Sequence, residues 1–181
     1  MFSKESRLNL ANLVTYTNIS LGLLAIYFIT QGDFFLAIVF AWCAGGLDIV
    51  DGKVARKFNL SSEFGIQIDS FADFISFVIT PVFLLFYVVE KANIYEEVFF
   101  GVVSIFYIIS ALVRLIEFNI KSEAGSVAKY FEGIPTPLGA IVIWIFYLLY
   151  AYSLVTNVFV LAFLLGMTGF LLNSKIKIPH P

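Results

Sequence analysis

Six long apolar segments, separated by short polar breaks, run through this sequence. Each is close to the roughly 20 residues that a helix needs to cross the hydrocarbon core of a bilayer. A backbone in such a core must satisfy its own hydrogen bonds, so each segment is predicted to form an α-helix. The six predicted helices are residues 12–30, 34–58, 63–89, 95–120, 136–152 and 156–173.

The composition agrees with an all-α integral membrane protein. Hydrophobic residues make up 60% of the chain and charged residues 13%, whereas about 25% of a soluble domain is charged. Cys43 is the only cysteine and His180 the only histidine, which argues against a disulfide framework, a zinc site built from cysteine or histidine, and a Ser-His-Asp triad. No basic tract is long enough to indicate nucleic-acid binding.

The basic residues predict the orientation in the membrane. With six spans, only Lys91 falls on one side, and the other side is therefore cytoplasmic, with both chain termini. We expect a multi-pass protein of the cell membrane, in which residues 1–11 form a short interfacial segment. The whole chain, 1–181, is predicted to be one membrane domain with a six-helix core at 12–173. The basic residues on the cytoplasmic side are Lys4, Arg7, Lys53, Arg56, Lys57, Arg114, Lys121, Lys129, Lys175 and Lys177.

The third predicted helix carries two local signals. Ser61 or Ser62, just ahead of Glu63, can accept a hydrogen bond from a first-turn N–H group and so predicts where the helix begins. Pro81 lies inside the same helix. Because proline lacks a backbone N–H, it predicts a kink there.

Four aspartates lie near the predicted cytoplasmic ends of the second and third helices. Asp48 and Asp51 are three residues apart, and Asp69 and Asp73 are four apart, so each pair occupies one helix face. An uncompensated charge in a membrane costs about 3 kcal/mol or more, and a cation is therefore expected between them. Carboxylate oxygens favour Mg²⁺, Mn²⁺ or Ca²⁺ over zinc or copper. Four carboxylates suit two such ions, which can clamp a displacement at phosphorus.

Other interpretations of these aspartates remain open at this point. A single acid at a helix end is usually solvated, but that does not explain four acids in two helix-spaced pairs. A divalent-cation transporter would also carry membrane carboxylates, although nearer the bilayer centre. A purely structural membrane protein leaves the four acids unexplained.

The residues around the aspartates form a longer pattern. Its eight fixed residues span 26 positions, and at every one of them it resembles the motif of the CDP-alcohol phosphotransferase family. The six-span layout is also similar, so the resemblance covers nearly the whole chain. The pattern reads Asp48-x₂-Asp51-Gly52-x₂-Ala55-Arg56-x₈-Gly65-x₃-Asp69-x₃-Asp73.

The resemblance implies a metal-dependent transfer at the cytoplasmic membrane edge, and a homodimer. A CDP-linked lipid would bind with its pyrophosphate on two divalent cations, Mg²⁺ or Mn²⁺, with Ca²⁺ as an alternative. An alcohol would attack the lipid-side phosphorus and CMP would leave, with Asp73 as general base and Arg56 acting on the pyrophosphate. The implied metal ligands are Asp48, Asp51, Asp69 and Asp73. The implied CDP-lipid residues are Asn12, Thr15, Gly52, Ala55, Arg56, Ser62 and Gly65.

Two further segments resemble the phosphatidylserine synthase branch of that family. Residues 114–119 read RLIEFN and residues 133–137 read GIPTP. Glu117 departs from the branch pattern, which has a second arginine there. The resemblance implies transfer from a CDP-diacylglycerol-type lipid to L-serine, giving phosphatidylserine or archaetidylserine. Glycerol 3-phosphate, inositol and inositol phosphate are the alternative acceptors, and Glu117 disfavours a phosphorylated one. The implied serine-binding residues are Arg114, Asn119, Lys129, Gly133, Pro135 and Thr136.

Overall fold

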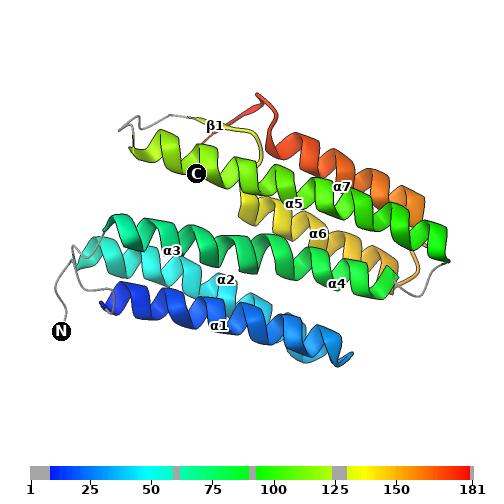
Figure 1. Cartoon of the computed structure of the whole chain (residues 1–181), viewed down its shortest axis with the longest axis horizontal. Helices are drawn as coiled ribbons and strands as arrows, with labels where there is room; N and C mark the ends of the chain where they lie inside the picture. Colours follow the sequence, from blue (N-terminus) through cyan, green and yellow to red (C-terminus); the bar gives the residue numbers. More distant parts are fainter. Residues whose placement is uncertain (1–8, 59–61, 90–92, 124–129, 180–181) are drawn as a thin grey trace. The chain divides into compact units, whose positions relative to one another are not determined.

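Helices form at all six predicted segments of this computed structural model, which describes residues 9–58, 62–89, 93–123 and 130–179 (Figure 1). Of the expected interfacial segment, residues 1–8 lie outside the described residues, and Leu10 already begins the first helix. The helices are α1 Leu10–Thr30, α2 Phe34–Lys57, α3 Glu63–Asp73, the π-helical η1 Phe74–Ile79, α4 Thr80–Val89, α5 Ile94–Glu123, α6 Thr136–Ala151 and α7 Val158–Leu172.

Short polar side chains begin several of these helices. Ahead of α1, Asn9 Oδ1 accepts a hydrogen bond from the Asn12 N–H at 2.9 Å. Ahead of α3, Ser62 Oγ accepts from the Gly65 N–H at 3.0 Å, which confirms the cap expected there. Asn157 caps α7 in the same way. These caps satisfy first-turn N–H groups that have no partner within the helix.

The third predicted helix changes its hydrogen-bond pattern shortly before Pro81. The backbone N–H of Thr80 donates to the Ile75 carbonyl oxygen, five residues back, and the Thr80 hydroxyl donates to the same oxygen at 2.8 Å. Bonds from residue i to i+5 define a π-helical turn, which is rare and is often found at functional sites. A π-helical turn over Phe74–Ile79 thus precedes Pro81, and the kink expected at Pro81 stays a prediction.

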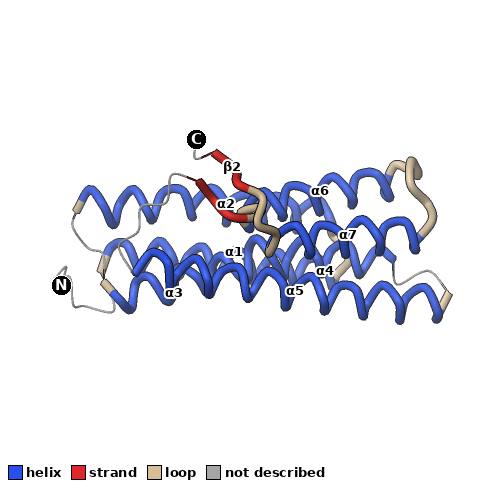
Figure 2. The backbone as a smooth tube through the Cα atoms, turned by 90° about the horizontal axis from the view of Figure 1, so that it is seen from above, coloured by secondary structure: helices blue, strands red, loops and turns tan. Residues whose placement is uncertain are grey.

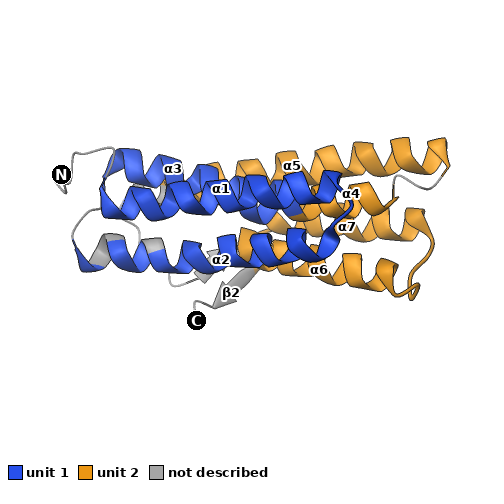
Figure 3. Cartoon of the chain, turned by 90° about the horizontal axis from the view of Figure 1, so that it is seen from below, with its two compact units in different colours: residues 1–80 blue, residues 81–181 orange. Residues whose placement is uncertain are grey.

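The chain divides into two compact units, residues 1–80 and 81–181 (Figure 3). In the first unit, α1 and α2 are joined by a three-residue turn and pack along each other, and α3 and η1 pack against α1. Small side chains are buried where these helices meet, among them Ala25, Ala37 and Ala44. Small residues let helix backbones approach closely, which is how membrane helices gain packing without a hydrophobic driving force.

In the second unit, α5 packs mainly against α7, and α6 contacts both. Tyr107 of α5 is fully buried, and two glycines make room for it. A Cβ on Gly169 would lie 3.3 Å from the Tyr107 Cα, and a Cβ on Gly139 would lie 2.7 Å from its hydroxyl oxygen. The glycines of α6 and α7 therefore let both helices close around this tyrosine.

Two short strands, which the all-α prediction did not include, join the loop before α6 to the segment after α7 (Figure 2). Strand β1, Tyr130–Glu132, pairs antiparallel with β2, Lys177–Pro179. Beside the sheet, the Gly133 N–H donates to the Ile176 carbonyl oxygen at 2.8 Å, and the Ile134 N–H donates to that of Leu171 at 3.2 Å. The loop before α6 is thus bonded through its backbone to the end of α7.

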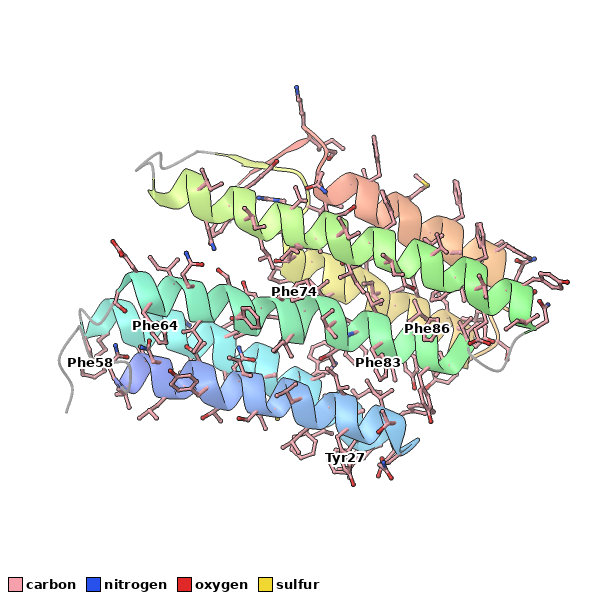
Figure 4. All side chains as sticks on the ribbon, viewed as in Figure 1. Tyr27, Phe58, Phe64, Phe74, Phe83 and Phe86 are labelled. Atoms are coloured by element: carbon pink, nitrogen blue, oxygen red, sulfur yellow. The ribbon has the colours of Figure 1, made fainter. Side chains whose placement is uncertain are left out.

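The helices are those of a multi-pass membrane protein. Large apolar side chains point outward, such as Phe35 and Phe170 at 75% and 70% exposure, and Tyr27 projects away from α1 (Figure 4). Helices α6 and α7, with 16 and 15 residues, are shorter apolar helices. In the described residues, four segments are long and apolar enough to cross a membrane: Leu10–Thr30, Phe34–Val54, Glu63–Val89 and Ile94–Ile120.

We expect Gly133→Ala to destabilise the protein more than Gly32→Ala. Both glycines have positive φ, +79° and +75°, where an alanine costs about 1–2 kcal/mol. At Gly133 the new Cβ would also collide with the carbonyl oxygen of Leu172, whereas nothing lies within 4 Å at Gly32. Thermal unfolding in detergent measures both, and equal losses in Tm would contradict the contact between this loop and α7.

Candidate active site

The side chains of Asp48 and Asp73 lie within hydrogen-bonding reach of each other. Asp48 lies in the second half of α2, and Asp73 is the last residue of α3. Both side chains are half-buried, and Oδ1 of Asp73 is fully buried. The chain therefore brings together two acids, one from each motif pair, on neighbouring helices.

The other two aspartates of the motif lie one helical turn away from this contact. Asp69 is half-buried and precedes Asp73 by four residues on α3, so the two share a helix face. Asp51 follows Asp48 by three residues on α2, and its side chain lies outside the described residues. Among the side chains that are described, no three acids, cysteines or histidines converge as a metal-binding group. The expected set of four carboxylates thus remains a prediction, anchored by the Asp48–Asp73 contact.

Two carboxyl groups in contact cannot both stay ionised without compensation. Two adjacent negative charges repel each other, so a proton or a cation must lie between or beside the two carboxyl groups. The donors are carboxylate oxygens, the ligands that Mg²⁺ and Mn²⁺ prefer. The chemistry of this pair therefore fits a hard divalent cation.

The beginnings of α1 and α3 meet in the first unit (Figure 1). A Cβ on Gly65 would lie 3.2 Å both from Asn12 Oδ1 and from Ser62 Oγ, so the glycine lets these two polar side chains pack closely against the α3 backbone. Asn12 and Thr15 are buried on α1. Two helix N-termini side by side favour an anion, because their N–H groups and dipoles point the same way. These four residues are among those expected to bind the CDP-lipid.

The remaining residues expected to bind the CDP-lipid lie on the last turns of α2. Gly52 is half-buried. Ala55 and Arg56 belong to the same helix, and their side chains lie outside the described residues. The roles expected for Arg56 and Ala55 therefore rest on the motif.

The residues expected to bind serine fall in the second unit. Arg114 is buried on α5, with 6% exposure, and Thr136 is buried at the first position of α6. Gly133 lies in the loop bonded to α7, and Pro135 precedes α6. Asn119 is half-buried near the end of α5, and Lys129 lies outside the described residues.

Several buried polar residues were missed by the sequence analysis, among them Asn18, Ser76 and Tyr107. Asn18 of α1 accepts a hydrogen bond from the Ser76 hydroxyl at 2.7 Å. The Tyr107 hydroxyl is buried beside Gly139, with no hydrogen-bond partner among the described residues. Asn18 could have been found, because Asn12, Thr15 and Asn18 recur at helical spacing within an apolar segment and so share one face. Ser76 and Tyr107 carry no comparable signal.

Comparison with known protein families matches residues 8–170 to the CDP-alcohol phosphatidyltransferase family. The chain belongs to this family. The matched region contains the whole aspartate motif and both segments expected to bind the acceptor. Members of the family generally depend on divalent cations, in agreement with the carboxylate pair.

Relatives in bacteria, archaea and yeast share the name CDP-diacylglycerol–serine O-phosphatidyltransferase. The protein from Bacillus subtilis is 33% identical over 171 residues, which cover 93% of this chain and 88% of that protein. The one from Methanocaldococcus jannaschii is 33% identical over 179 residues, covering 99% and 78%. The one from Saccharomyces cerevisiae is 30% identical over 154 residues, covering 75% and 52%.

We expect Asp48→Asn to stabilise the metal-free protein while weakening its metal binding. The substitution removes one of two adjoining negative charges, so Tm without metal should rise. It also removes a carboxylate ligand, so Mn²⁺ affinity should fall by at least about tenfold. Thermal unfolding in detergent with and without Mn²⁺ measures both effects.

Asp33→Asn is the matched control, because Asp33 is exposed and caps α2 by accepting from the Leu36 N–H at 3.1 Å, a role that asparagine can keep. Its Tm and its response to Mn²⁺ should match the wild type. A response to Mn²⁺ that survives Asp48→Asn would contradict the role of Asp48.

Proposed function

We propose that this protein transfers a phosphatidyl-type group from a CDP-diacylglycerol-type lipid to the hydroxyl of L-serine, releasing CMP. The family supports the reaction type, and the contact between Asp48 and Asp73 supports a site for it. The observation that carries serine as the acceptor is the agreement among relatives aligned over almost the whole chain, which are named for serine.

We propose six membrane spans, with both termini and the aspartates at the cytoplasmic face of the cell membrane. Ten of the eleven basic residues fall on that side, which supports the orientation. At 1.5 Å per residue, α6 and α7 are about 24 and 22 Å long, so adjoining turn residues would complete their crossings. We also propose a homodimer, as the family resemblance suggests.

The CDP-diacylglycerol-type lipid would bind where α1, α2 and α3 meet. Its pyrophosphate is an anion, and the adjoining N-termini of α1 and α3 favour negative charge. Asn12, Thr15, Ser62 and Gly65 lie there, and the missing side chain of Gly65 lets the Asn12 and Ser62 side-chain oxygens lie close to the α3 backbone. The motif adds Gly52, Ala55 and Arg56 of α2, and the Arg56 guanidinium could donate two parallel hydrogen bonds to a phosphate.

We assign Asp48, Asp51, Asp69 and Asp73 as ligands of two divalent cations, Mg²⁺ or Mn²⁺, with Ca²⁺ as an alternative. When bound, such ions neutralise the charge of the pyrophosphate and acidify a nearby hydroxyl. A bound cation would also stabilise the ionised carboxylates, because it offsets the repulsion between these half-buried acids. Phosphoryl transfer depends more on positioning and charge neutralisation than on covalent help from the protein.

In the transfer step, Asp73 acts as general base. Its carboxylate takes the proton of the serine hydroxyl while the serine oxygen forms a bond to the lipid-side phosphorus. The bond between that phosphorus and the bridging pyrophosphate oxygen breaks, and CMP leaves with that oxygen. The base is held near a second acid, Asp48, and no covalent intermediate with the protein is needed.

Serine recognition is assigned to the second unit. A zwitterion needs a cation for its carboxylate and oxygen acceptors for its ammonium group. Arg114 is a buried cation, and the Asn119 side chain can accept from an ammonium group. Gly133, Pro135 and Thr136 belong to the loop and helix start that are bonded through the backbone to the end of α7, and Lys129 is assigned by resemblance.

The test of the proposed function is CMP release from radiolabelled CDP-diacylglycerol by purified protein with Mn²⁺ and a panel of alcohols. Serine should support release, whereas ethanolamine, which lacks the carboxylate, should support far less. Excess EDTA should stop the reaction. Release with glycerol 3-phosphate or inositol but not with serine would contradict the acceptor assignment. No release with any alcohol, together with ion flux in liposomes, would favour a transporter.

We expect Asp73→Asn to reduce kcat by about 10²–10⁴-fold, the range that general-base catalysis contributes. The amide cannot accept the serine proton, but CDP-lipid binding should persist. Steady-state kinetics and binding of labelled CDP-lipid separate the two effects. Glu63→Gln is the matched control, since Glu63 is an exposed acid in the first turn of the same helix. Full activity in Asp73→Asn would remove Asp73 from the role of base.

A further inference from the structure

A π-helical turn begins directly after Asp73, the acid that contacts Asp48. The turn η1 covers Phe74–Ile79 and packs against both α1 and α2. A π turn contains about one residue more than an α turn, so it changes how the segments before and after it are rotated. The position of this turn therefore affects the direction in which the preceding carboxylates point.

One buried hydrogen bond joins this turn to α1. The Ser76 hydroxyl donates to Asn18 Oδ1 at 2.7 Å, and the two side chains are 3% and 0% exposed. The Asn18 Nδ2 atom is buried with no hydrogen-bond partner among the described residues. The Ser76 hydroxyl is thus the partner that orients the Asn18 side chain from across the helix interface.

The same contact is confined on its other sides. A Cβ on Gly22 would lie 2.9 Å from Ile75 Cγ2 and 3.1 Å from Ser76 Oγ, so the turn lies directly on the α1 backbone. The Thr80 hydroxyl donates to the Ile75 carbonyl oxygen at 2.8 Å within the π turn. Ser76 therefore fixes the turn against α1, and Thr80 closes it from within.

We infer that Ser76, Asn18 and Thr80 are positioning residues for the metal-binding carboxylates. They hold the π turn in one register against α1, and this register directs Asp69 and Asp73 toward Asp48. Ser76 follows Asp73 by three residues, close to one helical turn. A rotation of the helix at η1 therefore also rotates the Asp73 side chain. The inference rests on the proposed function, because it assigns these carboxylates to a metal site.

A role in stability alone would not require a hydrogen-bonded pair of polar side chains at this position. Apolar side chains of similar shape can replace a buried hydrogen-bonded pair with little loss of stability. A buried polar pair differs in that it accepts only one register, because any other register leaves both groups without a partner. The polar pair therefore selects the rotation of the helix that carries Asp69 and Asp73.

The test uses the full chain in detergent with Mn²⁺ alone as the probe. Free Mn²⁺ is followed by its electron paramagnetic resonance signal, and thermal unfolding checks that each variant is folded. Ser76→Ala should weaken Mn²⁺ binding by about tenfold, the usual effect of removing a group that orients metal ligands. Its kcat should fall at low Mn²⁺ and recover in part at high Mn²⁺, while KM for serine stays within about twofold of the wild type.

The matched control is Ser104→Ala, because Ser104 is also buried in an apolar helix but its hydroxyl donates within α5, to the Phe100 carbonyl oxygen at 2.8 Å. It should leave Mn²⁺ affinity unchanged. Thr80→Val is the second test variant, since it keeps the shape of the side chain and removes only the hydroxyl. It should also weaken Mn²⁺ binding.

The outcomes separate this inference from the proposed function. Wild-type Mn²⁺ affinity in the folded variants Ser76→Ala and Thr80→Val overturns the positioning role and leaves the proposed function intact. If one variant fails to fold, the other decides. If both fail to fold, the residues serve the stability of the fold and the positioning role is overturned. A wild-type protein that binds no Mn²⁺ contradicts the proposed metal site and this inference with it.

Discussion

Two half-buried carboxyl groups in contact, Asp48 of α2 and Asp73 of α3, set the condition that the rest of this structure meets. Placing charge inside a helical membrane bundle is costly, and placing two like charges together costs more. A cation can offset that cost only if the helices hold the oxygens in place. The packing of α1, α2 and α3 is therefore part of the chemistry as well as of the fold.

Small residues and buried hydrogen bonds hold the helices of the first unit together. Alanines such as Ala25 and Ala44 let the helices approach, and Gly22 brings the π turn against the α1 backbone. In an apolar surrounding a hydrogen bond between side chains has no water to compete with, so the Ser76–Asn18 pair specifies one arrangement of its helices. The π turn thus follows directly after Asp73 and precedes Pro81.

In the second unit, backbone hydrogen bonds fix the loop before α6. Gly133 adopts positive φ, and its N–H group donates to the Ile176 carbonyl oxygen in the segment after α7. Asn173 adds a side-chain bond to the Ser110 carbonyl oxygen at 2.9 Å. These bonds join the loop before α6 to the end of α7, and α5 to the residue after α7.

The sequence by itself determined the helical segments and the membrane character, and it predicted the chemistry of the site. Apolar length is read from consecutive residues, and the spacing of Asp48, Asp51, Asp69 and Asp73 places two pairs of acids on two helix faces whatever surrounds them. The cap at Ser62 is local for the same reason.

Only the tertiary structure decided which groups meet. The pairing of Asn18 with Ser76, the fit of Tyr107 against Gly139 and Gly169, and the pairing of β1 with β2 join residues far apart in the chain. The π turn before Pro81 is similar, because its register depends on what lies across the helix interface. Local sequence sets the hydrogen bonds within a helix, whereas the rotation of one helix against another is set by side chains that only the folded chain brings together.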